Sequence, residues 1–144
     1  MSTRVFIAAL CAAFVLALGA CGDGESDQER ALDQVCDARA DIQTHIGELS
    51  RLTPSAGTLE QIKQSLTAIA DDLAKMREAR ADLSGERRKQ VESATSAFTS
   101  ELGRAVEGLG TPRSLSGDAR TQTQRASAAL RDSYREALEP IDCG

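Results

Sequence analysis

The strongest pattern in the sequence is a ladder of large apolar residues in its middle part. The members follow one another at alternating steps of three and four residues: Leu59, Ile62, Leu66, Ile69, Leu73 and Met76. This spacing places them on one face of an α-helix, in the heptad pattern of coiled coils and antiparallel bundles. Arg80 and Leu83 occupy the next two rungs. We therefore predict a helix that begins just after Thr58, a residue whose type and place suit an N-cap.

Three further segments carry similar apolar faces, at about residues 27–52, 86–109 and 118–138. The residues predicted to point inward are Leu32, Val35, Ile42, Ile46, Leu49 and Leu52 in the first, Val91, Ala94, Phe98, Leu102, Ala105, Val106 and Leu109 in the next, and Ala119, Ala126, Leu130, Tyr134, Ala137 and Leu138 in the last. Arg39 interrupts the first of these ladders. No run combines β-branched residues with the clean alternation of a strand.

Short segments that disfavour helix separate these faces, and they contain Pro54, Ser84-Gly85, and the stretch 108–117. Four apolar faces of similar length favour an all-α fold, an antiparallel four-helix bundle. The alternative keeps residues 58–108 as one long central helix, with the two flanking helices folded back on it. Such a helix would be about 77 Å long, which is rare in a small domain, so we favour the bundle.

Residues 1–20 have the layout of a signal peptide. Arg4 supplies a positive charge, and residues 5–18 form an uncharged, largely apolar run. Its length fits the roughly 7–15 apolar residues of a signal peptide and falls short of the ~20 residues that span a bilayer. We expect this segment to be removed, together with Cys11.

The apolar run ends in Leu18-Gly19-Ala20-Cys21, which resembles the lipobox of bacterial lipoproteins. The resemblance implies cleavage after Ala20 and a diacylglyceryl group on the Cys21 sulfur. It therefore implies lipid anchoring to the cell membrane on the extracytoplasmic side. Residues 21–27 would form a polar, flexible tether, and residues 28–144 the helical domain. The alternative is an ordinary secretory peptide that leaves Cys21 as a thiol.

Cys36 and Cys143 remain as a pair once Cys21 carries lipid. The outer compartment permits oxidation, and in an up-down-up-down bundle the two positions lie at the same end. Closing a loop of this length stabilises a fold by roughly 4–5 kcal/mol, so we predict a structural disulfide. A redox or metal site is the alternative, but the chain has no Cys-x-x-Cys spacing, and its one histidine is His45.

No arrangement in the sequence can be assigned to catalysis, a metal or a cofactor, so we expect neither an enzyme nor a bound cofactor. His45 falls at the edge of an apolar helix face, and no nucleophile motif accompanies it. Asp33, Asp37 and Asp41 recur every four residues. This row is more typical of a solvated helix face than of a cation site, which usually gathers oxygen ligands from a loop.

Charge and aromatic content argue against nucleic acid as a partner. The chain carries a formal net charge of −5 at pH 7, and removal of Arg4 with the signal makes the remainder more acidic. Beyond residue 20 the aromatic residues are Phe98 and Tyr134, which are too few for a platform on which bases stack. We expect both of them in or beside the core.

Residues 75–89 concentrate positive charge. The basic residues are Lys75, Arg77, Arg80, Arg87, Arg88 and Lys89. In the bundle they lie at the end that also holds the acidic start and finish of the helical domain. Ion pairs within the chain are one interpretation of such a cluster. The more specific alternative is that these arginines contact anionic lipid headgroups.

Three stretches, residues 35–39, 82–88 and 134–143, resemble a loose set of small exported helical proteins of GC-rich Gram-positive bacteria. The resemblance implies a helical fold and no particular activity. We therefore expect a membrane-anchored helical module that binds another envelope component or assembles through its helices. The alternative is a carrier whose bundle opens to hold a lipid or another apolar ligand.

Overall fold

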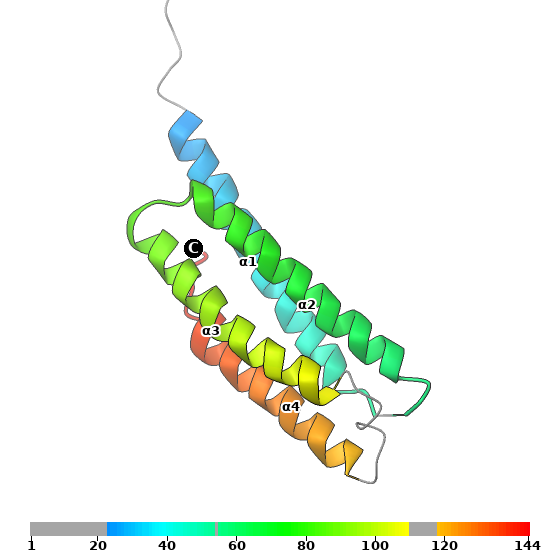
Figure 1. Cartoon of the computed structure of the whole chain (residues 1–144). Coiled ribbons are helices and arrows are strands. Elements are labelled where there is room, and N and C mark those ends of the chain that lie inside the picture. The colour runs from blue at the N-terminus through cyan, green and yellow to red at the C-terminus, as the bar shows by residue number, and fades with distance from the viewer. Residues whose placement is uncertain (1–22, 54, 110–117) are drawn as a thin grey trace, which may run out of the picture.

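The computed structural model describes residues 23–53, 55–109 and 118–144, and within these ranges the regular secondary structure is helical. The elements are α1 (Asp23–Leu49), α2 (Leu59–Ala79), a short 3₁₀ turn η1 (Arg80–Asp82), α3 (Gly85–Leu109), α4 (Ala119–Ser133) and a π-helical turn η3 (Tyr134–Leu138) that continues α4. The four long helices run alternately in opposite directions (Figure 1). The predicted all-α fold, an antiparallel four-helix bundle, is confirmed.

The helices pack in chain order around the bundle. α1 lies along α2, α2 along α3, and α3 along α4, while the contact between α1 and α4 that closes the ring is the sparsest of the four. The first turns of α1 project beyond the connection between α2 and α3 (Figure 1). The bundle therefore has an extended end, formed by α1, and a looser seam, between α1 and α4.

The core consists largely of the predicted apolar ladders. In α2 every rung from Ile62 to Met76 is buried, and Phe98 at the centre of α3 is fully buried. Val106 is an exception, because 46% of its surface is exposed. Successive residues of a helix lie about 100° apart, so the buried neighbour Ala105 turns Val106 toward solvent.

The inner face of α4 also differs from the prediction. Ala126 is only half-buried, whereas Thr123 and Ser127 are buried in its place. Neither hydroxyl has a hydrogen-bond partner among the described residues. The side chain of Ala119 lies outside the described part of the chain. The first half of α4 therefore presents small hydroxyl side chains to the core, and its large apolar residues begin only at Leu130.

Thr58 precedes α2 as predicted, but its side chain forms no capping hydrogen bond with the helix. Its hydroxyl donates to the Thr53 carbonyl at 2.7 Å and accepts from the Ser55 amide at 2.9 Å. The residue therefore fixes the loop between α1 and α2 from within and leaves the first turn of α2 uncapped by a side chain.

The chain reverses between α2 and α3, so the single-helix alternative for residues 58–108 is wrong. After η1, Leu83 adopts an extended backbone and is buried, and Gly85 follows with φ of +57°. This left-handed conformation favours glycine because a β-carbon is strained there. The side chain of Ser84 donates a hydrogen bond to Gln28 Oε1 of α1 at 2.9 Å.

α1 begins at Asp23, within the segment predicted to be a flexible tether. The apolar pattern could not reveal this start, because the first buried residue among the described side chains of the helix is Ala31. Backbone hydrogen bonding carries the helix beyond its core-facing part, and an exposed pair between Arg30 and Asp27 at 3.0 Å supports it.

We expect Phe98→Ala to lower the free energy of unfolding by about 3–5 kcal/mol, because it removes a fully buried ring and leaves a cavity. Val106→Ala on the same helix is the matched control and should change it by no more than about 0.5 kcal/mol. Urea denaturation followed by circular dichroism measures both. Equal losses in the two variants would contradict the described core.

Candidate functional site

The disulfide lies at the centre of the best-defined cluster of polar contacts in the bundle. Cys36 of α1 is bonded to Cys143, with an Sγ–Sγ distance of 2.03 Å and a Cα–Cα distance of 5.9 Å. The predicted pairing is confirmed. It ties the segment that follows η3 to the side of the first helix.

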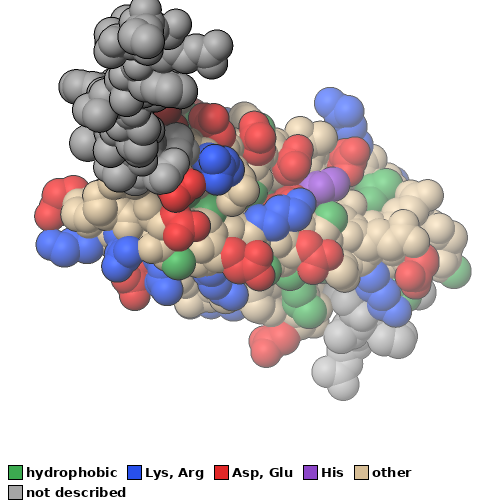
Figure 2. Space-filling view, turned by 90° about the horizontal axis from the view of Figure 1, so that it is seen from above, with side chains coloured by type: hydrophobic (Ala, Val, Ile, Leu, Met, Phe, Trp, Pro, Cys, Tyr) green, Lys and Arg blue, Asp and Glu red, His purple; other side chains and the backbone are tan. Residues whose placement is uncertain are grey.

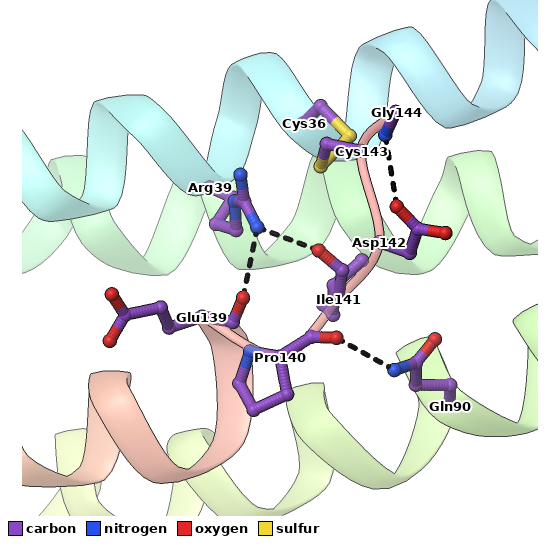
Figure 3. The surroundings of a disulfide bond; sticks show 9 residues. All are labelled: Cys36, Arg39, Gln90, Glu139, Pro140, Ile141, Asp142, Cys143 and Gly144. Atoms are coloured by element: carbon purple, nitrogen blue, oxygen red, sulfur yellow. Dashed lines mark hydrogen bonds between the residues drawn. A yellow bond between two sulfur atoms is a disulfide. The ribbon is translucent and has the colours of Figure 1, made fainter.

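Arg39, which interrupts the apolar ladder of α1, anchors the same segment. Its Nη1 donates to the carbonyl oxygens of Glu139 at 3.1 Å and Ile141 at 2.7 Å (Figure 3). The last carbonyls of a helix have no partner within it, and a cation near them is favourable. Arg39 therefore caps the end of η3 from the neighbouring helix, which explains why a charged residue stands at an inward-facing position.

A third contact fixes the segment from the opposite side. Gln90 of α3 donates through Nε2 to the Pro140 carbonyl at 3.0 Å, and Ile141 inserts its side chain into the core (Figure 3). The end of the described chain is thus held by α1 and α3 together. The predicted disulfide indicated that the end of the chain is tied to α1, but nothing in the sequence indicated the roles of Arg39 and Gln90.

The positive charges of residues 75–89 are mostly engaged within the chain. Arg88 donates to the Leu83 carbonyl at 2.8 Å and the Ala81 carbonyl at 2.6 Å, so it caps the end of η1. The other contacts join Arg80 to Glu92, Lys89 to Glu86, Lys75 to Asp72 and Arg77 to the Thr99 hydroxyl. These contacts favour intramolecular pairing as the role of the cluster.

His45 lies at the boundary of the core and contacts two carboxylates. Its Nδ1 is 3.1 Å from Glu48, and its Nε2 is 3.8 Å from the buried carboxylate of Asp72 on α2. Asp72 also accepts a hydrogen bond of 2.7 Å from Lys75, and this contact raises the pKa of the Lys75 ammonium. The group bridges α1 and α2, and no feature of the sequence pattern predicted that Asp72 would be buried.

The acidic row of α1 is solvated, as predicted. Asp33, Asp37 and Asp41 are all exposed. Asp37 and Asp41 line a shallow groove that Lys75 of α2 also borders. Among the residues that the structure describes, no cluster of histidine, cysteine and acidic side chains is arranged to hold a metal ion.

An open groove of about 680 Å³ runs along the outer side of α3 and α4. Its floor consists of small side chains, among them Ala97, Ala129 and Ser133, and a second hollow continues it toward the start of α4. Asp132 and Glu136 line one end of the groove, whereas Arg125 and the ion pair of Arg104 with Glu101 lie toward the other. Seen from above the bundle, acidic and basic side chains are mixed across the surface (Figure 2).

The predicted lipid acceptor, Cys21, lies outside the described residues, as does the whole segment 1–20. Within the described ranges, no helix is both long enough and apolar enough to cross a membrane. Comparison with protein-family models, curated proteins and solved structures gives no match.

We expect the double variant Cys36→Ser/Cys143→Ser to lower the free energy of unfolding by about 4–5 kcal/mol, because its unfolded chain is no longer constrained by the long loop. Urea denaturation of the oxidised protein and the variant measures the difference. A reducing agent should destabilise the original protein and leave the double variant unchanged. Identical unfolding midpoints for oxidised and reduced protein would contradict the structural role of the bond.

Proposed function

We propose that this protein is a lipoprotein anchored at Cys21 to the extracytoplasmic face of a bacterial cell membrane. Its helical domain would serve there as a non-enzymatic binding or structural module. The observation that carries the proposal is the order of the first segments. The lipobox-like sequence ends at Cys21, and the folded helix α1 begins at Asp23. A lipid on Cys21 would therefore be joined to the bundle almost directly.

The disulfide supports the extracytoplasmic location. Structural disulfides form and persist in oxidising compartments outside the cytosol, and Cys36 and Cys143 form one here. Two acyl chains on Cys21 give stable membrane attachment, since each buried methylene contributes about 0.8 kcal/mol. The projecting start of α1 would then place the end of the bundle that carries the α2–α3 connection toward the membrane (Figure 1).

The contacts of the titratable side chains favour a module over an enzyme. His45 and Asp72 link two helices, and Arg39 and Arg88 cap helix ends. General acid–base or nucleophilic catalysis needs groups that are free to face a substrate. These four side chains serve the fold instead.

The groove between α3 and α4 supports self-association as the way in which the module acts. Its small floor residues permit the close approach of another helix. A second copy turned by a two-fold axis would place its acidic end, at Asp132 and Glu136, near Arg125 of the first, whereas Arg104 at that end is already paired with Glu101. The carrier alternative would instead require the bundle to open, since the described grooves lie outside its packed core.

We expect Cys21→Ser to abolish lipid anchoring, so that the protein is either released to the medium or retained as an uncleaved precursor. Fractionation of the producing cells, with intact-mass measurement of the protein, distinguishes the variant from the original. A normally processed variant that still partitions with the membrane would contradict the anchor.

We expect native mass spectrometry of the full chain to show a dimer that Ala97→Arg disrupts, because the substitution places a long charged side chain on the groove floor. Ala74→Arg, at an exposed position of α2, is the matched control and should leave the dimer intact. Co-purified lipid on a monomeric chain would favour the carrier instead. A monomer without lipid, or equal effects of the two variants, would contradict self-association through this groove.

A further inference from the structure

A pocket of about 360 Å³ lies on the seam between α1 and α4. Gln43 and Gly47 line it from α1, and Arg131, Tyr134, Arg135 and Glu139 line it from α4 and the π-helical turn that follows. π-helical turns in otherwise regular helices often mark functional sites. Apart from the Glu139 carbonyl, which accepts a hydrogen bond from Arg39, none of the roles assigned above to the disulfide, the helix caps or the α3–α4 groove involves this pocket.

Tyr134 supplies the first indication of a ligand, because it brings a side chain with a hydroxyl group to the lining of the pocket. Only 5% of the residue is exposed. Burial raises the pKa of Tyr134, Arg39 opposes this effect and Glu139 adds to it, so that the phenol keeps its proton. The hydroxyl therefore keeps the hydrogen that it could donate to a ligand.

Positive charge supplies the second indication. Arg131 and Arg135 are one helical turn apart on the two sides of Tyr134, and both line the pocket. Neither forms an ion pair with any described residue. Gly47 leaves open space on the α1 side, because a β-carbon built there would meet no atom within 4 Å.

We propose that this pocket binds a phosphate group, with the Arg131 and Arg135 guanidinium groups, the Tyr134 hydroxyl and the Gln43 amide as its donors. Guanidinium groups match phosphate oxygens in pairs of parallel hydrogen bonds. Two such groups together with two neutral donors suit the several oxygens of phosphate better than the two of a carboxylate. Glu139 at the rim carries a like charge and weakens the binding of the anion.

The phosphate has two possible sources, a soluble phosphate compound or a lipid headgroup. Gln43 and Gly47 lie about 30–36 Å along α1 from Asp23, at 1.5 Å per residue. A bundle that stands upright on an anchor at Cys21 would hold the pocket away from the bilayer. A bundle that lies flat would bring it to the headgroups.

Tyr134 is also a reporter for its own site, because the chain contains one tyrosine and no tryptophan. The full, oxidised chain is titrated with sodium phosphate at constant ionic strength, and tyrosine fluorescence is followed with N-acetyltyrosinamide as the reference for collisional quenching. We expect a saturable change that Arg131→Gln/Arg135→Gln weakens by at least about tenfold. Arg125→Gln, on the same helix but in the α3–α4 groove, is the matched control and should leave it unchanged.

Two further variants separate binding from folding. Glu139→Gln removes the negative charge that repels the phosphate, so it should tighten binding severalfold. Loss of structure could not produce such a gain. Gly47→Asp fills the open space with a negative charge and should abolish binding while thermal unfolding stays cooperative. Vesicles of phosphatidylglycerol, compared with phosphatidylcholine, form the second arm of the titration.

The outcomes are distinct. A saturable response to free phosphate identifies a soluble ligand, and a response to anionic vesicles alone identifies a headgroup, provided that Arg131→Gln/Arg135→Gln removes it. The proposal is overturned if neither arm gives a saturable response, or if Arg125→Gln weakens binding as much as the double variant.

Discussion

The fourth helix is the part of the bundle that burial of apolar surface holds least firmly. Its first half turns Thr123 and Ser127 toward the core, and its large buried residues begin only at Leu130. Each hydroxyl without a partner reduces the benefit of burial. The covalent bond at Cys143 and the hydrogen bonds from Arg39 compensate, because they fix the far end of this helix to α1 where packing between the two helices is sparse. This attachment closes the bundle on the side where α1 and α4 have the sparsest contact.

The same seam accounts for the position of the pocket. α1 packs more extensively along α2 than along α4, although shallow surface grooves also border the contact between α1 and α2. Between α1 and α4 the space near Gly47 remains open, and charged side chains at Arg131 and Arg135 border it. The feature that makes α4 dependent on the disulfide therefore also creates the concave surface on which an anion could bind.

Most of the fold follows from the spacing of apolar residues. The ladder from Ile62 to Met76 is buried as predicted, and the pairing of Cys36 with Cys143 follows from their even number after the lipid acceptor is set aside. Such patterns can be recognised in a sequence because burial of each large apolar side chain contributes a similar free energy of transfer from water. They define which elements form and, through short connections, how the elements are joined.

The errors arise where polar contacts between distant segments decide the outcome. In the sequence, Arg39 only interrupts the apolar face of the first helix. Its role could not be predicted, because the carbonyl groups that it caps lie about a hundred residues away in the sequence. Thr58 is a residue type that suits an N-cap, but its hydroxyl forms hydrogen bonds with the Thr53 carbonyl and the Ser55 amide of the loop instead. The burial of Asp72 and Ser127 likewise depends on how α2 and α4 rotate about their axes, which the apolar pattern fixes only to within about one residue.

The separation of the two bonded cysteines also imposes an order of events. A chain that emerges from its N-terminus onward, from a ribosome or through a translocation channel, exposes Cys36 well before Cys143, because 107 positions separate them. Until the later thiol arrives, the earlier one remains reactive on the surface of α1, and any partner that it takes must be exchanged. Covalent closure therefore follows the emergence of all four helices, and it distinguishes the molecules in which every helix has emerged.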